Sequence, residues 1–299
     1  MFDPATMAKP ATARRLIAGA RRYDVLVLNG SGSPLSELAA GAVIGLGRRP
    51  PKLVVADCVW GISSARLDRA MNRGALRLLD GEHVHYCVHS QAQRERFPGL
   101  WGVDLDRVHV ARYYYTLSEQ ELDLPADRDG SVFAGGESHR DYDPLIEAAR
   151  HVDARYVLAT GRLSRSQRAR LPQGSRAGRV PHDEFLSLMR RASVVVVPLA
   201  PREDRSAGEQ TYLNAMAMGK PVIVTDSLGV REYISDRETG LVVPPCDPDA
   251  MAAALAWTLD AANADDVARI AERGRELALR RFGPDQYVAG LLSVVDSVG

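Results

Sequence analysis

The 299-residue sequence is poor in cysteine, in net charge and in long apolar runs, and each shortage excludes a class of protein. Its 3 cysteines, Cys58, Cys87 and Cys246, are widely spaced, which excludes a disulfide scaffold and a Cys-x-x-Cys metal site. With 38 Lys+Arg against 38 Asp+Glu, the chain lacks the basic surface that nucleic-acid binding needs. Its longest apolar runs, Leu38–Leu46 and Ala192–Ala200, are far too short to cross a bilayer as a helix.

The N-terminal segment lacks the basic-then-apolar layout of a secretory signal. We therefore expect a cytoplasmic protein that makes at most peripheral contact with a membrane. What the sequence does have is the 45% hydrophobic content of a globular protein. Its length suggests two domains.

Short apolar runs alternate with amphipathic helical patterns, which predicts an α/β protein with parallel sheets and right-handed crossovers. The expected strands are Asp24–Leu28, Lys52–Ala56, His83–Val88, Arg107–Arg112, Ser131–Ala134, Arg155–Ala159, Ser193–Pro198, Pro221–Thr225 and Gly240–Val243. The expected helices are Ala13–Arg22, Leu35–Leu46, Ala65–Leu79, Gln91–Phe97, Pro144–His151, Asp183–Ala192, Glu209–Met218, Pro248–Leu259, Asp265–Arg281 and Asp285–Val298.

The polar stretch Leu122–Gly130, which contains Pro and Gly, is the expected seam between two domains. We predict a Rossmann-like domain over residues 1–125, a second one over residues 126–284, and a closing helix over residues 285–299 that packs back toward the first. Both domains are expected to be doubly wound parallel sheets that face each other across a cleft. Ligands of such sheets bind at the carboxyl ends of the strands, where helix N-termini present N–H groups.

A loop of small residues precedes the expected helix at Glu209. Small side chains let a phosphate approach the backbone, and the first N–H groups of the helix can then bind it. The residues concerned are Ser206, Ala207, Gly208, Glu209, Gln210 and Thr211. Asn214, one turn further on, can hydrogen-bond sugar hydroxyls. A capped helix after a flexible loop explains the same residues, so both interpretations stay open.

The sequence that follows resembles the donor-binding region of family 4, or group 1, glycosyltransferases of the GT-B fold. The resemblance rests on Leu213–Val222, Gly229–Glu232 and Glu238–Pro245, which read LNAMAMGKPV, GVRE and ETGLVVPP. It implies transfer of a sugar from a nucleoside diphosphate sugar to an acceptor hydroxyl, with retention of configuration and without a cofactor or a bound metal. The implied acceptor is a small molecule, a glycan or a lipid-linked compound. A protein partner or a homodimer is compatible with it.

The sequence departs from the family at two glutamates, of which one contacts the donor sugar and the other the ribose. Ser206 and Asn214 occupy these positions, and Glu209 is the nearest carboxylate, so it is a candidate to contact the sugar instead. An amide still binds a hydroxyl, so we expect Asn214 to keep the ribose contact. The loss of the glutamates favours one alternative, a degenerate transferase that binds a nucleotide sugar or regulates a partner. A further alternative, a GT-B sugar-nucleotide epimerase, would need acid/base carboxylates that the sequence does not place.

A second glycine-rich loop begins at Gly135 and Gly136, directly after an expected strand, and permits close approach to the backbone. The resemblance places Gly135 and Arg140 on the donor diphosphate, with one residue of spacing lost. Arg140 can stabilise the departing diphosphate without a proton transfer, so it is the first catalytic candidate. The resemblance also places Val180 beside the nucleotide base. Gly161 and Arg162, at the end of another strand, complete the donor-binding candidates.

The first half of the chain offers acceptor-side candidates. Its Gly/Ser loop, with Gly30, Ser31 and Gly32, can bind an anion or only turn the chain. Relative to the family, the sequence enters at the third strand, so we expect an abbreviated N-terminal domain. Asp57 stands where the family often has a histidine and is a catalytic candidate, for acceptor contact or proton removal. His89, at the end of a strand, is a further acceptor-side candidate.

His83, His85, Cys87 and His89 alternate along one expected strand and so share a face. One straight strand spreads four such residues over about 20 Å. Zinc needs its ligands within about 2.0–2.3 Å of one centre. We therefore expect these side chains to pack and expect no metal site.

Overall fold

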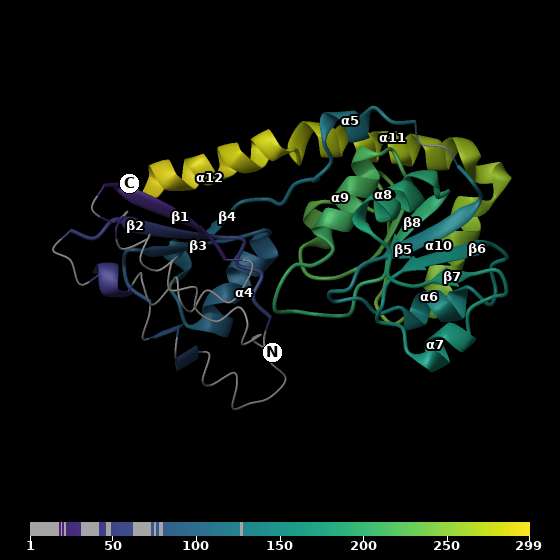
Figure 1. Cartoon of the computed structure of the whole chain (residues 1–299), viewed down its shortest axis with the longest axis horizontal. Helices are drawn as coiled ribbons and strands as arrows, with labels where there is room; N and C mark the ends of the chain where they lie inside the picture. The colour runs from purple at the N-terminus through teal and green to yellow at the C-terminus, as the bar shows by residue number, and fades with distance from the viewer. Residues whose placement is uncertain are drawn as a thin grey trace. The chain divides into compact units, whose positions relative to one another are not determined.

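The computed structural model describes residues 22–30, 42–45, 49–61, 73–74, 76–77, 80–125 and 128–299, together with residues 18 and 20. The chain forms two compact units (Figure 1). Unit 1 comprises Met1–Arg112, Glu203–Ser206 and Tyr287–Gly299, and unit 2 comprises Tyr113–Arg202 and Ala207–Gln286. The chain thus passes into unit 2 after Arg112, earlier than the expected seam at Leu122–Gly130, and the described residues of that polar stretch lie in unit 2.

Unit 1 is built on a four-stranded parallel sheet in the order β1-β2-β3-β4. Its strands are β1 Val25–Asn29, β2 Lys52–Ala56, β3 Val84–Val88 and β4 Val108–Val110. Helix α4, Gln91–Trp101, follows β3, and a 3-10 turn at Leu105–Arg107 takes the first residue of the strand expected at Arg107–Arg112. The helices expected at Ala13–Arg22, Leu35–Leu46 and Ala65–Leu79 lie mostly outside the described residues.

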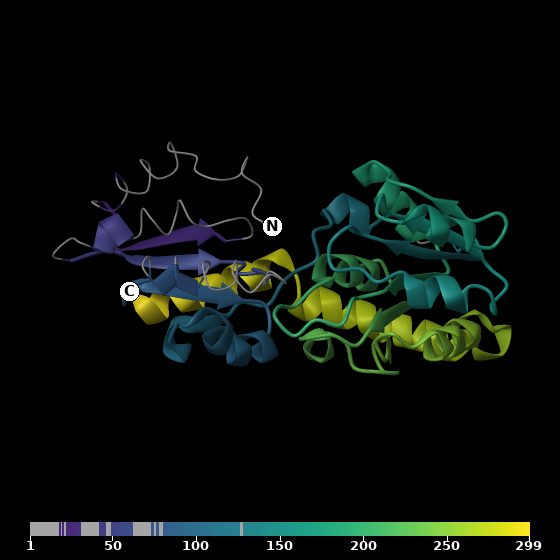
Figure 2. The ribbon, with the colours of Figure 1, turned by 90° about the horizontal axis from the view of Figure 1, so that it is seen from below.

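Alternation along the strands gives the unit 1 sheet two apolar faces. On one face Trp60 stacks in an aromatic cluster, with ring centroids 5.8 Å from Tyr86, 5.6 Å from Phe97 and 5.5 Å from Trp101. The other face is covered by helix α12, Pro284–Val298, whose Val294 and Val298 pack against Val54, Cys87 and Ala111 (Figure 2). Both faces of β2 and β3 are therefore buried, as their nearly continuous apolar runs predict.

Unit 2 contains a six-stranded parallel sheet in the order β10-β9-β8-β5-β6-β7. Its strands are β5 Ser131–Gly135, β6 Arg155–Ala159, β7 Arg176–Ala177, β8 Val194–Val197, β9 Val222–Thr225 and β10 Leu241–Val243. The first strand in the chain, β5, lies inside the sheet, with β6 and β7 on one side of it and β8 to β10 on the other. The carboxyl ends of β5 and β8 therefore form a topological switch point.

Helices cover both faces of the unit 2 sheet (Figure 2). The helices are α5 Glu119–Leu122, α6 Asp143–Ala148, α7 Arg165–Ala169, α8 His182–Arg191, α9 Glu209–Ala217, α10 Pro248–Leu259 and α11 Ala264–Arg281. Phe133 and Val195 pack with residues of α8, α9 and α11, whereas Val132 and Val194 pack with residues of α6 and α10. This doubly wound arrangement confirms the predicted α/β class. Among the described residues no helix is both long and apolar enough to span a membrane.

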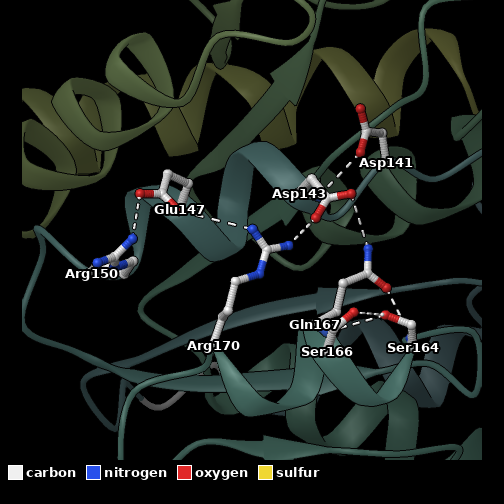
Figure 3. A network of polar contacts seen from close by, with 8 residues as sticks. All are labelled: Asp141, Asp143, Glu147, Arg150, Ser164, Ser166, Gln167 and Arg170. Atoms are coloured by element: carbon white, nitrogen blue, oxygen red, sulfur yellow. Dashed lines mark hydrogen bonds and ion pairs between the residues drawn. The ribbon is translucent and has the colours of Figure 1, made fainter.

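A polar network joins α6, which precedes β6 in the chain, to α7, which follows it (Figure 3). Asp143, at the start of α6, accepts a hydrogen bond from Gln167 Nε2 at 3.1 Å and pairs with Arg170. Ser164 caps α7 by accepting from Gln167 N at 3.1 Å. Arg170 also lies 4.0 Å from Glu147. These contacts hold the loop at the carboxyl end of β6, which leads toward the candidate site.

Every expected strand has a counterpart in the structure, and the expected helices from Gln91 onward are present with ends shifted by a few residues. Strand β7 and helices α5 and α7 were not predicted. Each is at most five residues long, too short to display an apolar period.

Buried His85 on β3 and half-buried His109 on β4 form a pair, with His85 Nδ1 3.1 Å from His109 Nε2. Burial lowers the pKa of His85 from 6.5 to about 4, and the neighbouring His109, Lys52, Arg107 and His83 lower it further by repelling a proton. Burial also lowers the pKa of His109. The pair is therefore neutral at pH 7, so it packs near the cations Lys52 and Arg107 without charge repulsion.

We expect this pair to weaken unit 1 in acid. Because the folded-state pKa of His85 lies below 6.5, the unfolded chain takes up the proton first as the pH falls. The stability that comes from keeping His85 neutral is fully present above pH 6.5 and is lost progressively as the pH falls to about 4. The free energy of unfolding of wild type should fall between these values by roughly 1–3 kcal/mol more than that of His85→Gln. Urea denaturation followed by tryptophan fluorescence at several pH values measures it.

The matched control is His151→Gln, since His151 is exposed. Its pH dependence should equal that of wild type. Parallel curves for wild type and His85→Gln would contradict the expectation.

Candidate functional site

The loop after β5 depends on two glycines at the switch point. A Cβ at Gly135 would lie 2.3 Å from Phe185 Cε2 and 3.0 Å from Phe133 Cζ, so a larger residue there would force these rings to shift. Gly136 has φ +116°, and its Cβ would lie 2.9 Å from Arg140 Nη2. The glycine pair thus lets the loop turn sharply and lets the Arg140 side chain fold against it.

Arg140 is held by both sides of the switch point. Its Nε donates to Gly135 O at 3.1 Å and its Nη1 donates to Ser138 O at 3.0 Å. Its Nη2 donates to Thr211 Oγ1 of α9 at 2.9 Å. Its backbone forms a bridge with Leu199, in the loop after β8. A guanidinium has more N–H groups than these bonds use, so the fixed fork can also bind an anion.

The electrostatics keep this arginine charged. Burial lowers the pKa of Arg140, while the neighbouring Tyr142, Glu209 and Tyr212 raise it. Glu209, the first residue of α9, is buried. A cation and a carboxylate therefore lie near each other at the edge of the sheet where the helix dipole of α9 is positive.

Helix α9 begins at a position that requires glycine. Gly208, its N-cap, has φ +88°, and a Cβ there would lie 2.9 Å from Leu199 Cδ2. Gln210 Nε2 donates to Thr116 Oγ1 at 3.1 Å. The structure thus brings Gly135, Gly136 and Arg140 together with the start of α9, and places Ala207 directly before it.

The two positions that carry glutamates in the resembled family are both engaged. Asn214 is buried, and its Oδ1 accepts from Thr116 N at 2.7 Å while its Nδ2 donates to Thr116 Oγ1 at 3.1 Å. Ser206 belongs to unit 1, where its Oγ lies 2.7 Å from the Oγ of Ser90, the N-cap of α4. The expected ribose contact of Asn214 stays a prediction.

Glu137, in the loop after β5, is a site residue that the sequence did not single out, and it contacts the loop at the carboxyl end of β6. It accepts from Gly161 N at 2.8 Å and lies 3.5 Å from Arg162 Nε and 3.4 Å from Arg179 Nε. Val180 follows Arg179 and packs against the core beside α8. The signal that would have found Glu137 is its place directly after the glycine pair.

Unit 1 carries a second polar group, at the carboxyl ends of β2 and β3. Asp57 has φ +53°, a backbone conformation that is unusual outside glycine. Its Oδ1 accepts from His89 Nε2 at 2.9 Å and from Tyr287 OH at 2.8 Å. Burial raises the pKa of the Asp57 carboxyl, but these hydrogen bonds and the proximity of His89 outweigh burial and leave the pKa below its usual value. Both bonds use Oδ1, so Oδ2 can accept a further hydrogen bond.

Of the other acceptor-side candidates, Gly30 has a packing role. Its N donates to Ala56 O at 2.6 Å, and its O accepts from Trp60 Nε1 at 2.7 Å. A Cβ at Gly30 would meet Ala56 O at 2.6 Å. Ser31 and Gly32 lie outside the described residues. Tyr287, which the sequence analysis did not single out, comes from α12 and carried no local signal.

Residues 132–261 match the family described as glycosyl transferases group 1. A curated relative, the uncharacterized glycosyltransferase MJ1178 of Methanocaldococcus jannaschii, is 25% identical over 194 residues, which are 62% of this chain and 53% of the relative. The chain thus spans about half the length of that relative.

Solved structures share the fold of this chain. A glycosyltransferase from Rickettsia africae ESF-5 matches with a TM-score of 0.69 and 16% identity, over 99% of this chain and 84% of that one. Anabaena Alr3699/HepE, solved in complex with UDP, matches with a TM-score of 0.73 and 17% identity, over 96% of this chain and 82% of that one. With its two parallel-sheet units, the chain has the GT-B fold, and residues 132–261, most of which lie in unit 2, match the group 1 glycosyl transferases.

Proposed function

We propose that this chain transfers a sugar from a nucleoside diphosphate sugar to an acceptor hydroxyl, with retention of configuration and without a metal. The observation that carries the proposal is the fixed guanidinium of Arg140 at the switch point, bonded to Gly135 and to Thr211 of α9. The UDP and UDP-glucose complexes of Alr3699/HepE support a UDP-sugar as donor.

The donor diphosphate would bind where the backbone, the helix dipole and Arg140 converge. Gly135 and Gly136 leave the backbone open to a phosphate, and the N-terminus of α9 contributes N–H groups and a partial positive charge. When the bond to the sugar breaks, negative charge grows on the diphosphate. A guanidinium already held by the protein stabilises this charge without reorganising. We assign Glu209 to the hydroxyls of the donor sugar.

The nucleotide base would lie at the carboxyl end of β6, beside Gly161, Arg162 and the main chain of Val180. Glu137 bonds to Gly161 N in this region and so fixes the loop against which the base would rest. The proposed acceptor is a hydroxyl of a small molecule, a glycan or a lipid-linked compound.

Asp57 is the proposed acceptor ligand. Because its pKa is lowered, its carboxyl is ionised at neutral pH and a weak base, so it is better suited to orienting a hydroxyl than to removing its proton. Oδ2 is the oxygen that would accept the hydroxyl, while His89 and Tyr287 hold Oδ1. In a retaining transfer the departing diphosphate can take the proton itself.

A second function, that of a nucleotide-sugar binder or regulatory subunit, is favoured by one observation. Neither Ser206 nor Asn214 supplies a carboxylate, and both are hydrogen-bonded within the protein.

Turnover distinguishes the two functions. We expect one of UDP, GDP, ADP or TDP, most readily UDP, to bind the folded chain and raise its melting temperature. At a hundredfold excess over Kd, binding adds about 2.7 kcal/mol to the free energy of unfolding. Its sugar conjugate should then release free diphosphate in the presence of an acceptor. Binding without release across a wide acceptor panel would select the binder, and no binding would refute both.

For Arg140→Ala we expect the affinity for UDP to fall about tenfold or more, while the affinity for uridine stays unchanged, because the lost contact is with phosphate. Isothermal titration with the two ligands measures the difference. Arg150→Ala, which removes an exposed arginine of the α6 end, is the control. An equal loss of affinity for UDP and for uridine would show that Arg140 does not contact the phosphates.

For Asp57→Asn we expect acceptor-stimulated release of diphosphate to fall about tenfold or more, because an ionised hydrogen-bond acceptor is lost. Hydrolysis of the donor by water, and donor affinity, should be unchanged. Tyr287→Phe, which removes one of the two bonds to Oδ1, should give a smaller loss of the same kind. An equal fall in donor hydrolysis would show that Asp57 does not act through the acceptor.

A further inference from the structure

After the chain passes into unit 2, the crossing segment Tyr113–Thr116 is fastened to three separate parts of that unit. Tyr113 N donates to Tyr233 OH at 2.9 Å, and Tyr115 N donates to the backbone O of Phe282 at 2.9 Å. Thr116 N donates to Asn214 Oδ1 at 2.7 Å. The segment belongs to neither sheet, so it lacks a strand partner and its N–H groups are paired one by one.

Asn214 makes the most specific of these contacts. Its Oδ1 accepts from the backbone of Thr116, and its Nδ2 donates to Thr116 Oγ1 at 3.1 Å. Two bonds of opposite direction to one residue fix the orientation of the amide. Gln210, one turn earlier on α9, donates to the same hydroxyl oxygen at 3.1 Å. The Asn214 side chain is therefore oriented by Thr116, and its burial restricts the access of a ribose hydroxyl to its remaining N–H group.

The same two turns of α9 also reach the proposed diphosphate site. Thr211, next to Gln210, accepts the hydrogen bond of Arg140 Nη2 at 2.9 Å. A helix is stiff over so short a length, because its own hydrogen bonds link each turn to the next. A shift of Arg140 toward a bound diphosphate would therefore be passed through Thr211 and α9 to Thr116.

We propose that Asn214 is a positioning residue which fastens the crossing segment to α9 and couples it to the nucleotide site, and that it does not bind ribose. The coupling rests on the proposed nucleotide-sugar function, whereas the fastening stands without it. An amide at this position has thus replaced a sugar contact by a contact within the protein.

The fastening is tested by hydrogen exchange of the Thr116 amide in the full chain without nucleotide, followed by NMR. Asn214→Leu keeps a similar side-chain volume and removes both polar atoms, and exchange should become about tenfold faster or more. Asn214→Asp keeps an oxygen for the Thr116 N–H, so its exchange should stay near that of wild type. If Asn214→Leu does not fold, Asn214→Ala replaces it. Unchanged exchange in the loss variant would overturn the proposal.

The coupling and the absence of ribose contact are tested with UDP and 2′-deoxy-UDP. In wild type, saturating UDP should slow exchange of the Thr116 amide by about threefold or more, and Asn214→Leu should abolish this effect. The preference for UDP over 2′-deoxy-UDP should be the same in both proteins. A preference that disappears in Asn214→Leu would make Asn214 a ribose ligand and overturn the proposal, as would an amide that does not respond to bound UDP. Failure of either nucleotide to bind wild type would count against the proposed function, and the exchange rates without nucleotide would still decide the fastening.

Discussion

The position of β5 inside the unit 2 sheet is the constraint on which the candidate site depends. Because later strands are added on both sides of β5, the loops that leave β5 and β8 diverge, and a ligand can reach the backbone between them. Arg140 spans this divergence, with bonds to Gly135 on one side and to Thr211 on the other. The positive φ angles of Gly136 and Gly208 favour glycine there, and a Cβ at Gly135, Gly136 or Gly208 would approach a side chain to 2.3–2.9 Å.

Each candidate site is also tied to a place where the chain passes between the units. In unit 1, Asp57 accepts a hydrogen bond from Tyr287, the first residue of the returning segment. In unit 2, Asn214 binds Thr116, close to the first crossing at Tyr113. Side chains near two of the places where the chain passes between the units thus orient groups within each unit. Such contacts satisfy polar atoms that packing alone would leave unpaired.

Local patterns predicted what local forces determine. The apolar runs of β5 and β8, and the small residues before α9, indicated the strands and the loops at their ends. The contacts that define the site join distant positions: Tyr287 to Asp57, and Thr116 to Asn214. These partners lie 230 and 98 residues apart along the chain, and no period or spacing encodes a contact at such a distance, so the role of Tyr287 could not be predicted. The early crossing after Arg112 was missed because the polar stretch Leu122–Gly130, with its Pro and Gly, has the composition of a linker although its described residues lie in unit 2.

The absence of the two glutamates of the resembled family raises the question of which side chains would stabilise the charges that develop during sugar transfer. As a sugar leaves a diphosphate, negative charge grows on the leaving group and positive charge on the sugar ring. In the proposed transfer, Arg140 would meet the first, and Glu209, which is buried and close enough to influence the pKa of Arg140, would meet the second. On that proposal, a cation and a carboxylate near the start of α9 supply both signs of charge. The proposed transfer therefore does not require a carboxylate at Ser206 or Asn214.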